Sequence, residues 1–405
     1  MNPPPPSVSQ HSPSWLLQYW YKLSNQSFML LGRHDVIRPE DGPAYLFSTS
    51  FRASVLQTDF SSRFSLVPWM TYRQWTGESI QGYYTDCGWG CMLRSAQMML
   101  AEALFRLESP NGSSTAPPQL RERILRQFVD DNESPYSIHQ MLKRSNRFGK
   151  HAGQWFEPTL TLLVIAEMLQ ERGIRAIVAR DGMLDASSLL PNAFAKSVGE
   201  GDEEEEEEED KYFDPLNEEM VSSRQSTSRP VLLFVPVRLG VRELNEAMYG
   251  KALALALRFP QSIGIIGGKP GRSLYFCGSQ NNSKLVYLDP HTVQNTLPFS
   301  LHSYQCHEAK VMPISEVDPS MALGFLVHSY QDFLELEARI LALPGPAMFS
   351  ISTKPAEFES DEDLDDFAYE DNDDDGGEGE EEGFEHVPPP PTPPPKKKPD
   401  DFVLL

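Results

Sequence analysis

The sequence predicts an α+β fold in which several helices come first and a mostly antiparallel sheet follows. Apolar residues recur at helical spacing in the first half of the chain, whereas short runs rich in branched and aromatic residues dominate the stretch from residue 231 to residue 352. Helices and strands that are segregated along a chain are typical of this class. The sequence contains no internal repeat.

The expected elements follow in order. Helical periodicity predicts helices at residues 92–107, 118–129 and 158–172, and Gly173 supplies a stop signal for the last of them. An aromatic amphipathic stretch at residues 15–21 is interpreted as a helix packed on the folded body, with a partner-binding peptide as the alternative. Further helices are expected at residues 243–257 and 330–343, and strands at residues 175–180, 231–237, 263–266, 274–277, 285–288, 323–328 and 348–352.

Composition separates one folded domain from three segments of different character. Residues 1–44 begin Pro-rich and are interpreted as an N-terminal extension, and the domain is expected to span residues 45–355. Inside it, residues 181–229 turn polar and strongly acidic, which predicts a disordered insertion because such a segment cannot bury an apolar core. Residues 356–405 are acidic, then Pro-rich, then Lys-rich, and are expected to form a disordered tail.

The formal charge of −23 originates mainly in these segments, because acidic and basic residues nearly balance elsewhere. The only basic cluster is a run of three lysines, residues 396–398, so the composition argues against nucleic-acid binding. No secretory signal pattern opens the sequence, and no apolar run approaches the roughly 20 residues of a membrane-spanning helix. These features predict a cytoplasmic protein.

The cysteines are too few for a disulfide framework in a chain of 405 residues, which also indicates a reducing compartment. They are Cys87, Cys91, Cys277 and Cys306. Zinc binding by Cys87 and Cys91 would need a second pair of ligands, and the other two cysteines lack metal-site spacing. We therefore expect no metal and no cofactor.

One cysteine stands at the expected start of a helix. Residues 86–94 read Asp-Cys-Gly-Trp-Gly-Cys-Met-Leu-Arg, so Cys91 follows a glycine-containing turn and precedes the apolar periodicity. The positive end of a helix dipole favours a thiolate and can lower a cysteine pKa from about 8.5 to roughly 3.5–7.5. A buried structural cysteine is the simpler interpretation of this residue when it is considered alone.

A carboxylate and an imidazole follow a short apolar strand far along the chain. Pro290 ends this strand, and Asp289 and His291 are two residues apart, so both side chains project to one side of an extended backbone. A carboxylate beside an imidazole fixes its tautomer and stabilises the imidazolium that forms when the ring takes a thiol proton. This pair alone is weak evidence, but together with Cys91 it predicts a Cys–His–Asp nucleophilic site.

Long motifs in a fixed order carry a family resemblance. Besides residues 86–94, they are Pro-Gln-Ser-Ile-Gly-Ile-Ile-Gly-Gly-Lys-Pro-Gly-Arg-Ser-Leu-Tyr-Phe at residues 260–276 and Tyr-Leu-Asp-Pro-His-Thr at residues 287–292, with shorter blocks at 70–73, 153–156 and 317–325. These motifs are similar to those of the autophagins, the autophagy-related protein 4 cysteine proteases, which are a branch of the papain-like peptidases. The first motif and the last four residues resemble the larger animal paralogues.

The resemblance implies a papain-like catalytic domain at residues 45–355, with the nucleophile helix packed on the sheet. It makes Cys91 the nucleophile, His291 its base, Asp289 the residue that orients the base, and Tyr72 a donor of the oxyanion hole. Without the resemblance, Tyr72 would be interpreted as a core aromatic residue.

The resemblance also assigns a lid to the catalytic cleft. Trp155 is similar to the tryptophan that covers the cleft in the family. The family's mobile loop, which closes over the cysteine, corresponds to Lys269, Pro270, Gly271 and Arg272. An ordinary hairpin turn is the alternative for these four residues.

The activity that the resemblance implies is cleavage after the C-terminal glycine of ubiquitin-like modifiers of the autophagy-related protein 8 type. The same thioester mechanism would first mature the precursor and later release the modifier from phosphatidylethanolamine, so the protein would meet a membrane through its lipidated substrate. The C-terminal residues Phe402 and Leu405, preceded by two aspartates, are similar to a short motif that such modifiers capture. Two alternatives stay open: a catalytically restrained modifier-binding protein, and a protease for another ubiquitin-like modifier.

Overall fold

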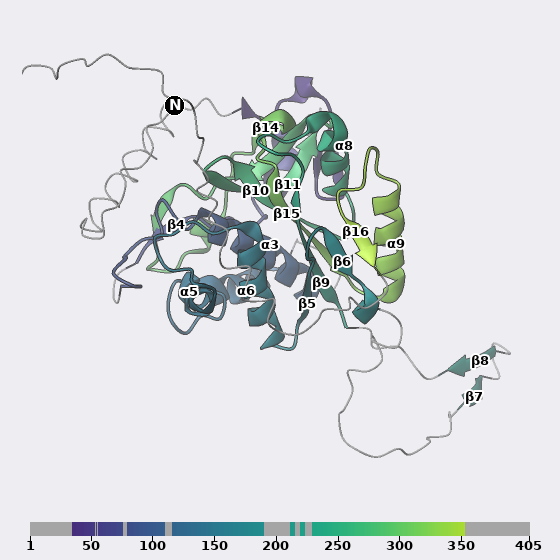
Figure 1. Ribbon diagram of the computed structural model, residues 1–405, viewed down its shortest axis with the longest axis horizontal. Helices are drawn as coiled ribbons and strands as arrows, with labels where there is room; N and C mark the ends of the chain where they lie inside the picture. The colour runs from purple at the N-terminus through teal and green to yellow at the C-terminus, as the bar shows by residue number, and fades with distance from the viewer. Residues whose placement is uncertain are drawn as a thin grey trace, which may run out of the picture. The chain divides into compact units, whose positions relative to one another are not determined.

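The computed structural model describes residues 35–52, 54, 56–75, 79–109, 116–189, 211–214, 219–222 and 229–352. Its main sheet contains β1 (Asp35–Val36), β2 (Ala44–Leu46), β3 (Thr49–Phe51), β5 (Arg175–Val178), β9 (Val231–Arg238), β10 (Ser262–Lys269), β11 (Arg272–Gln280), β12 (Lys284–Leu288), β14 (Lys310–Pro313) and β15 (Ser320–Val327). The strand order is β1-β14-β12-β11-β10-β15-β9-β5, and β2 pairs with β11 and β3 (Figure 1). Only the β5–β9 pair is parallel within this sheet, so the predicted α+β class with a mostly antiparallel sheet is confirmed.

Helices cover both faces of this sheet. The helices are α2 (Ser61–Phe64), α3 (Cys91–Glu108), α4 (Pro118–Leu125), α5 (Ile138–Ser145), α6 (Pro158–Gln170), α8 (Glu246–Ala256) and α9 (Tyr330–Leu341). Along β9, Leu232 and Phe234 pack into the core shared with α3 and α6, whereas Leu233 and Val235 pack into the core shared with α8 and α9. Because both faces are buried, the central strands are continuous apolar runs in the sequence.

The expected helix at residues 92–107 is α3, which packs on β10 and β11. The helix expected at residues 118–129 is α4 followed by a 3-10 turn at Arg126–Phe128, and the one at residues 158–172 is α6. Gly173 has a left-handed backbone with a φ of 70°, which suits a residue just beyond a helix end. The predicted packing of the Cys91 helix on the sheet is thus confirmed.

Two predicted boundaries are wrong. The N-terminal extension was expected to reach residue 44, but β1 pairs with β14, so at least residues 35–44 belong to the folded domain. The disordered insertion was expected at residues 181–229, but β6 (Met183–Asp185) pairs with β16 (Ser350–Ser352), and a 3-10 turn follows at Ser187–Leu189. Leu184 and Leu189 are buried in the core under α8 and α9, so isolated apolar residues here complete a core despite the polar composition.

Two further small sheets are present. β4 (Tyr72–Gln74) pairs with β13 (Val293–Asn295) in parallel, and β7 (Lys211–Asp214) pairs with β8 (Glu219–Ser222) in antiparallel orientation. Other helical turns lie at Pro39–Asp41, Leu56–Phe60, Asn146–Phe148, Leu301–Tyr304 and Ile314–Glu316. The expected helix at residues 15–21 and the tail at residues 356–405 lie outside the described residues.

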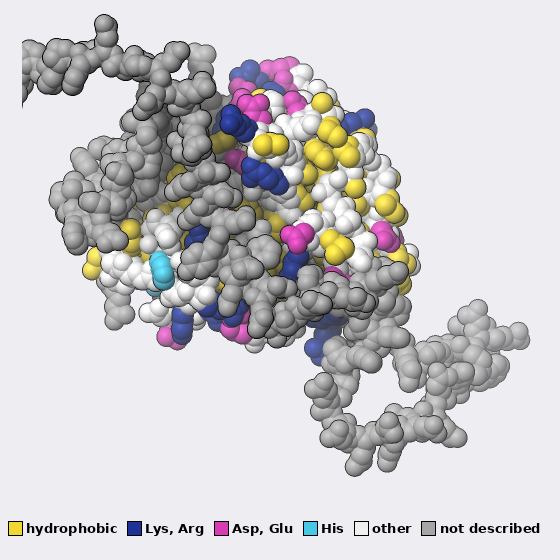
Figure 2. All heavy atoms as spheres, viewed as in Figure 1, with side chains coloured by type: hydrophobic (Ala, Val, Ile, Leu, Met, Phe, Trp, Pro, Cys, Tyr) yellow, Lys and Arg dark blue, Asp and Glu magenta, His cyan; other side chains and the backbone are white. Residues whose placement is uncertain are grey.

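The surface carries charges of both signs. On the face in Figure 2, Lys and Arg side chains lie beside Asp and Glu side chains, which agrees with the near balance of charge outside the acidic segments. No helix within the described ranges is long and apolar enough to cross a membrane.

Candidate active site

Cys91 is the first residue of α3, and its side chain is partly exposed. The preceding turn is closed by the backbone N–H groups of Trp89 and Gly90, which donate to the Asp86 carbonyl over 3.2 and 2.9 Å. A Cβ at position 90 would lie 2.6 Å from the Asp86 side chain, so only glycine fits there. This turn places the Cys91 sulfur at the positive end of the α3 dipole.

The Asp86 carboxylate connects this turn to β4. Its Oδ1 accepts a hydrogen bond from the backbone N–H of Arg73 over 2.7 Å, and its Oδ2 accepts one from Nε of Arg94 over 2.7 Å. Arg94 also donates to both oxygens of Asp130, each over 2.9 Å. Burial raises the pKa of Asp86, although the charge of Arg94 opposes this rise. The network holds β4 against the turn that precedes α3.

Asp289 and His291 lie on the connection between β12 and β13. Oδ1 of Asp289 is 2.6 Å from Nδ1 of His291 and accepts a hydrogen bond from the His291 backbone N–H over 3.1 Å. Oδ2 of Asp289 lies 3.7 Å from a guanidinium nitrogen of Arg272 and 3.8 Å from Nζ of Lys310. Burial alone would raise the pKa of Asp289, but His291 and the two cations hold it well below its usual range.

The Cys91 thiol and the His291 ring interact and shift each other's pKa. Burial alone would raise the pKa of Cys91, but the hydrogen bond and charge of His291, with hydrogen bonds from the Ser273 backbone and the Tyr72 side chain, lower it. Burial alone would lower the pKa of His291, but Asp289 and Cys91 raise it. These opposite shifts favour a thiolate–imidazolium pair.

Tyr72 is buried beside this pair. Its backbone N–H donates to the Pro290 carbonyl over 2.8 Å, and its ring lies edge-on to the His291 ring with 5.3 Å between centroids. Burial and the neighbouring Cys91 raise the pKa of the phenol well above its usual value. Tyr72 therefore stays protonated and can donate a hydrogen bond to an anion beside the sulfur.

Comparison with known proteins agrees with this geometry. The family model described as the peptidase C54 catalytic domain matches residues 57–339. The chain belongs to the peptidase C54 family. It is similar to the cysteine protease atg4 of Emericella nidulans, with 33% identity over 67% of this chain and 64% of that protein. It is also similar to the cysteine protease ATG4A of Mus musculus, with 31% identity over 79% of this chain and 88% of that protein.

A third relative is the cysteine protease ATG4D of Xenopus laevis, with 29% identity over 73% of this chain and 69% of that protein. The chain thus spans slightly less than two thirds of the fungal relative and more of the two animal relatives. Membership confirms the predicted autophagin family and the class of cysteine-type peptidase. The finer assignment to the larger animal paralogues stays a prediction.

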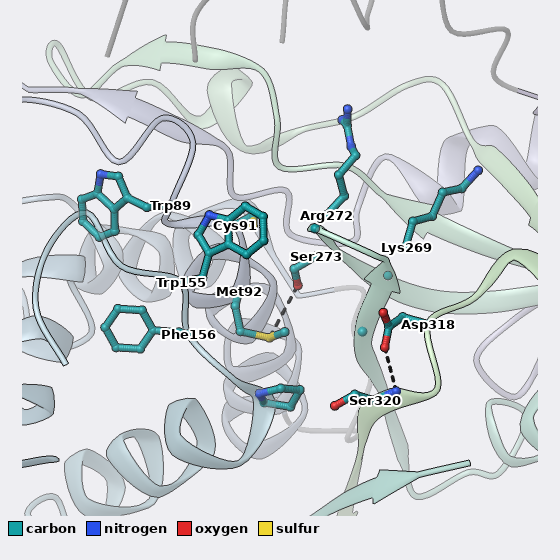
Figure 3. A pocket seen from close by; sticks show the side chains of 14 residues that line it. Trp89, Cys91, Met92, Trp155, Phe156, Lys269, Arg272, Ser273, Asp318 and Ser320 are labelled. Carbon is teal, nitrogen blue, oxygen red and sulfur yellow. Dashed lines mark hydrogen bonds between the residues drawn. The ribbon is translucent and has the colours of Figure 1, made fainter. Parts of the chain in front are cut away.

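A cleft of about 150 Å³ opens beside Cys91 in this C54 domain. Figure 3 shows Trp155 and Phe156 on one side of the cleft and Lys269, Asp318 and Ser320 on the other. Trp155 is 52% exposed, and its Nε1 donates to the Gly88 carbonyl over 2.9 Å.

The residues assigned to the lid form a tight turn at the rim of the cleft. Lys269 ends β10 and pairs with Arg272, the first residue of β11, so Pro270 and Gly271 form the tip. Gly271 has a φ of 73°, and a Cβ on it would lie 3.2 Å from Cη2 of Trp155. The indole therefore packs directly against the turn.

The structure thus brings Cys91, His291, Asp289 and Tyr72 together and places Trp155 and the turn at the adjoining cleft. Phe402 and Leu405 lie outside the described residues. Within the described part of the chain, no group of three or more His, Cys, Asp or Glu residues is placed to hold a metal ion.

Sequence reasoning missed several residues of the site. The backbone of Ser273 helps to lower the pKa of Cys91, and its hydroxyl donates to Ser95 over 3.0 Å. Its place after the turn, inside the motif at residues 260–276, was the only available signal. Asp318 accepts a hydrogen bond from the Ser320 backbone over 2.8 Å and shapes the opposite wall.

Proposed function

We propose that this chain is a cysteine protease that cleaves after the C-terminal glycine of ubiquitin-like autophagy modifiers of the autophagy-related protein 8 type. The observation that carries the proposal is the buried Asp289–His291 pair, with 2.6 Å between Oδ1 and Nδ1, next to Cys91 at the start of α3. The lowered pKa of Cys91 favours the thiolate that a nucleophile needs, and the raised pKa of His291 favours the protonated ring that an acid needs. Membership in the C54 family supports the choice of substrate.

In the proposed mechanism, the Cys91 thiolate attacks the carbonyl carbon of the glycine and forms a tetrahedral oxyanion. The Tyr72 hydroxyl and the Cys91 backbone N–H donate to this oxyanion, and one such donor typically lowers the barrier by about 2.7–4 kcal/mol. His291 gives its proton to the leaving nitrogen as the C–N bond breaks, which leaves a thioester on Cys91. Asp289 holds the imidazole in orientation throughout.

Hydrolysis of the thioester completes the cycle. Neutral His291 accepts a proton from a water molecule as the water oxygen attacks the thioester carbonyl. The C–S bond then breaks, the Cys91 thiolate is restored, and the modifier leaves with a C-terminal carboxylate. Neither step needs a cofactor.

The lid supports selectivity for glycine. Trp155 packs against Gly271 at the rim of the cleft that Cys91 lines, so movement of the turn away from the indole would widen the access to the sulfur. Gly271 has a positive φ, a backbone conformation that few other residues adopt, so glycine suits the tip of this turn. A slot between an indole and a turn admits glycine and excludes larger side chains.

Both maturation and delipidation fit one site. They are acyl transfers from the same glycine carbonyl, and only the leaving amine differs, a peptide in one reaction and phosphatidylethanolamine in the other. The protein would then meet a membrane through its lipidated substrate, and nucleic acid would have no part in the reaction. We place the reaction in the cytoplasm, since none of the four cysteines is in a disulfide.

A panel of purified ubiquitin-like precursors tests the proposal. Each precursor is incubated with the wild type and with Cys91→Ala, and products are identified by intact mass. We expect cleavage after glycine in autophagy modifiers with the wild type alone. Cleavage of a different modifier would identify another substrate, whereas binding without cleavage by the wild type would indicate a modifier-binding protein.

A further inference from the structure

We propose that Arg272 is a positioning residue for catalysis, which acts through Asp289 by holding its second carboxylate oxygen. The inference rests on the proposed protease function, because it assigns a role in the reaction of Cys91 and His291. It goes beyond the role of Arg272 as a residue of the lid.

The two oxygens of Asp289 have different partners. Oδ1 binds His291 through both Nδ1 and the backbone N–H, whereas Oδ2 faces Arg272 at 3.7 Å and Lys310 at 3.8 Å. Rotation of the carboxylate would separate Oδ1 from His291 and Oδ2 from both cations. The two cations therefore keep one oxygen available to the imidazole.

Burial makes these contacts effective. The side chains of Asp289, Arg272 and Lys310 are 7%, 17% and 13% exposed, so solvent and salt screen their charges only weakly. Arg272 also begins β11 and lines the cleft beside Cys91, whereas Lys310 lies on β14. Arg272 is thus the cation that reaches both the cleft and the candidate triad.

Charged and titratable groups surround both Asp289 and Cys91. His291, Arg272, Lys310, Tyr287 and Cys306 interact with Asp289, while His291, Tyr72 and the Ser273 backbone face Cys91. The tyrosine and Cys306 side chains are neutral near pH 7 because burial raises each pKa. A cation nearby favours deprotonation, so loss of the Arg272 charge should raise the pKa of both Cys91 and His291.

Three substitutions in the full-length protein test this role. Arg272→Gln removes the charge and keeps a polar side chain, and Arg272→Lys keeps the charge. Lys284→Gln is the matched control, since Lys284 begins β12 and pairs with Asp41 at 2.9 Å, away from the cleft. The readouts are the pH dependence of Cys91 alkylation by iodoacetamide, followed by mass spectrometry, and the pH dependence of kcat/KM for precursor cleavage.

We expect Arg272→Gln to move the alkylation midpoint up by about half to one pH unit, so that labelling below the midpoint slows roughly three- to tenfold. In the pH profile of kcat/KM for this variant, the rising limb and the falling limb should both move to higher pH. Arg272→Lys should recover most of the shift, and Lys284→Gln should keep the wild-type midpoint. If Arg272→Gln folds poorly, Lys310→Gln provides the same test, with a shift in the same direction.

A lower rate with an unchanged midpoint in both Arg272→Gln and Lys310→Gln would mean a structural role only and would overturn the inference. Alkylation needs no protein substrate. A wild type that cleaves no modifier would refute the proposed function without affecting this measurement, so the two failures can be told apart.

Discussion

Replacement of Arg94 by methionine should strongly destabilise the folded domain. Arg94 lies between Asp86 and Asp130, and the side chains of all three are at most 2% exposed. Methionine fills part of the volume but leaves both carboxylates without their cation. Removal of one partner from a buried ion pair costs about 3–5 kcal/mol, and here one arginine serves two carboxylates, so we expect the upper part of that range.

The measurement is thermal unfolding followed by circular dichroism. With about 2.1 cal/mol/K of unfolding entropy per residue, 1 kcal/mol corresponds to roughly 1.5 °C in Tm for a domain of about 300 residues, so the expected fall is about 6–8 °C. The matched control is Arg123→Met, which breaks the ion pair with Glu108 on the surface, where the Arg123 side chain is 65% exposed. A surface pair of this kind contributes about 0–1 kcal/mol. Equal losses of Tm in the two variants would refute the argument that burial makes the Arg94 network expensive to break.

Three further predictions concern chemistry, the acidic segment and the tail. Cys91→Ala should abolish precursor cleavage and leave modifier binding intact in a pull-down. Asp289→Ala should lower kcat by several orders of magnitude, because members of a triad act as a unit. Wild-type cleavage rates for these variants in a gel-based assay would rule out the assigned roles. Deletion of residues 199–225 should change Tm and turnover little, because β7 and β8 pair only with each other among the described strands; a large loss of activity would place this segment in the site. Phe402→Ala combined with Leu405→Ala should raise KM and leave kcat nearly unchanged, because a docking motif raises effective concentration without touching chemistry; identical modifier affinities by titration calorimetry would exclude a docking role.

The elements that could be predicted from sequence are those with long or uniform patterns. α3 and α6 carry helical periodicity over many residues, and β9 is a continuous apolar run. α5 escaped prediction because it has eight residues and depends on a local cap, in which the Ser137 hydroxyl accepts from the Gln140 backbone over 3.2 Å. β14 has four residues, which is too short for a period of two to stand out.

The candidate site was predictable only where residues are close in sequence. The two-residue spacing of Asp289 and His291 predicted that both would project to one side, and their 2.6 Å contact agrees with it. The cations on the other oxygen of Asp289 come from β11 and β14, which are brought to β12 by strand pairing. No local pattern around Arg272 or Lys310 indicates a contact with Asp289, so this part of the site required the tertiary structure.

The short strand β4 connects the turn before Cys91 to the segment that carries His291. Asp86 caps the turn before Cys91 and accepts a hydrogen bond from the Arg73 N–H on β4, while the neighbouring N–H on β4, that of Tyr72, donates to the Pro290 carbonyl. Pro290 lies between Asp289 and His291, so adjacent backbone groups of one short strand bind both halves of the candidate site. This arrangement explains why Tyr72 lies beside both Cys91 and His291: its backbone belongs to the strand that joins the Cys91 turn to the His291 segment. A substitution that weakens the hydrogen bonds of β4 should therefore change the Cys91–His291 distance as well as the position of the Tyr72 hydroxyl.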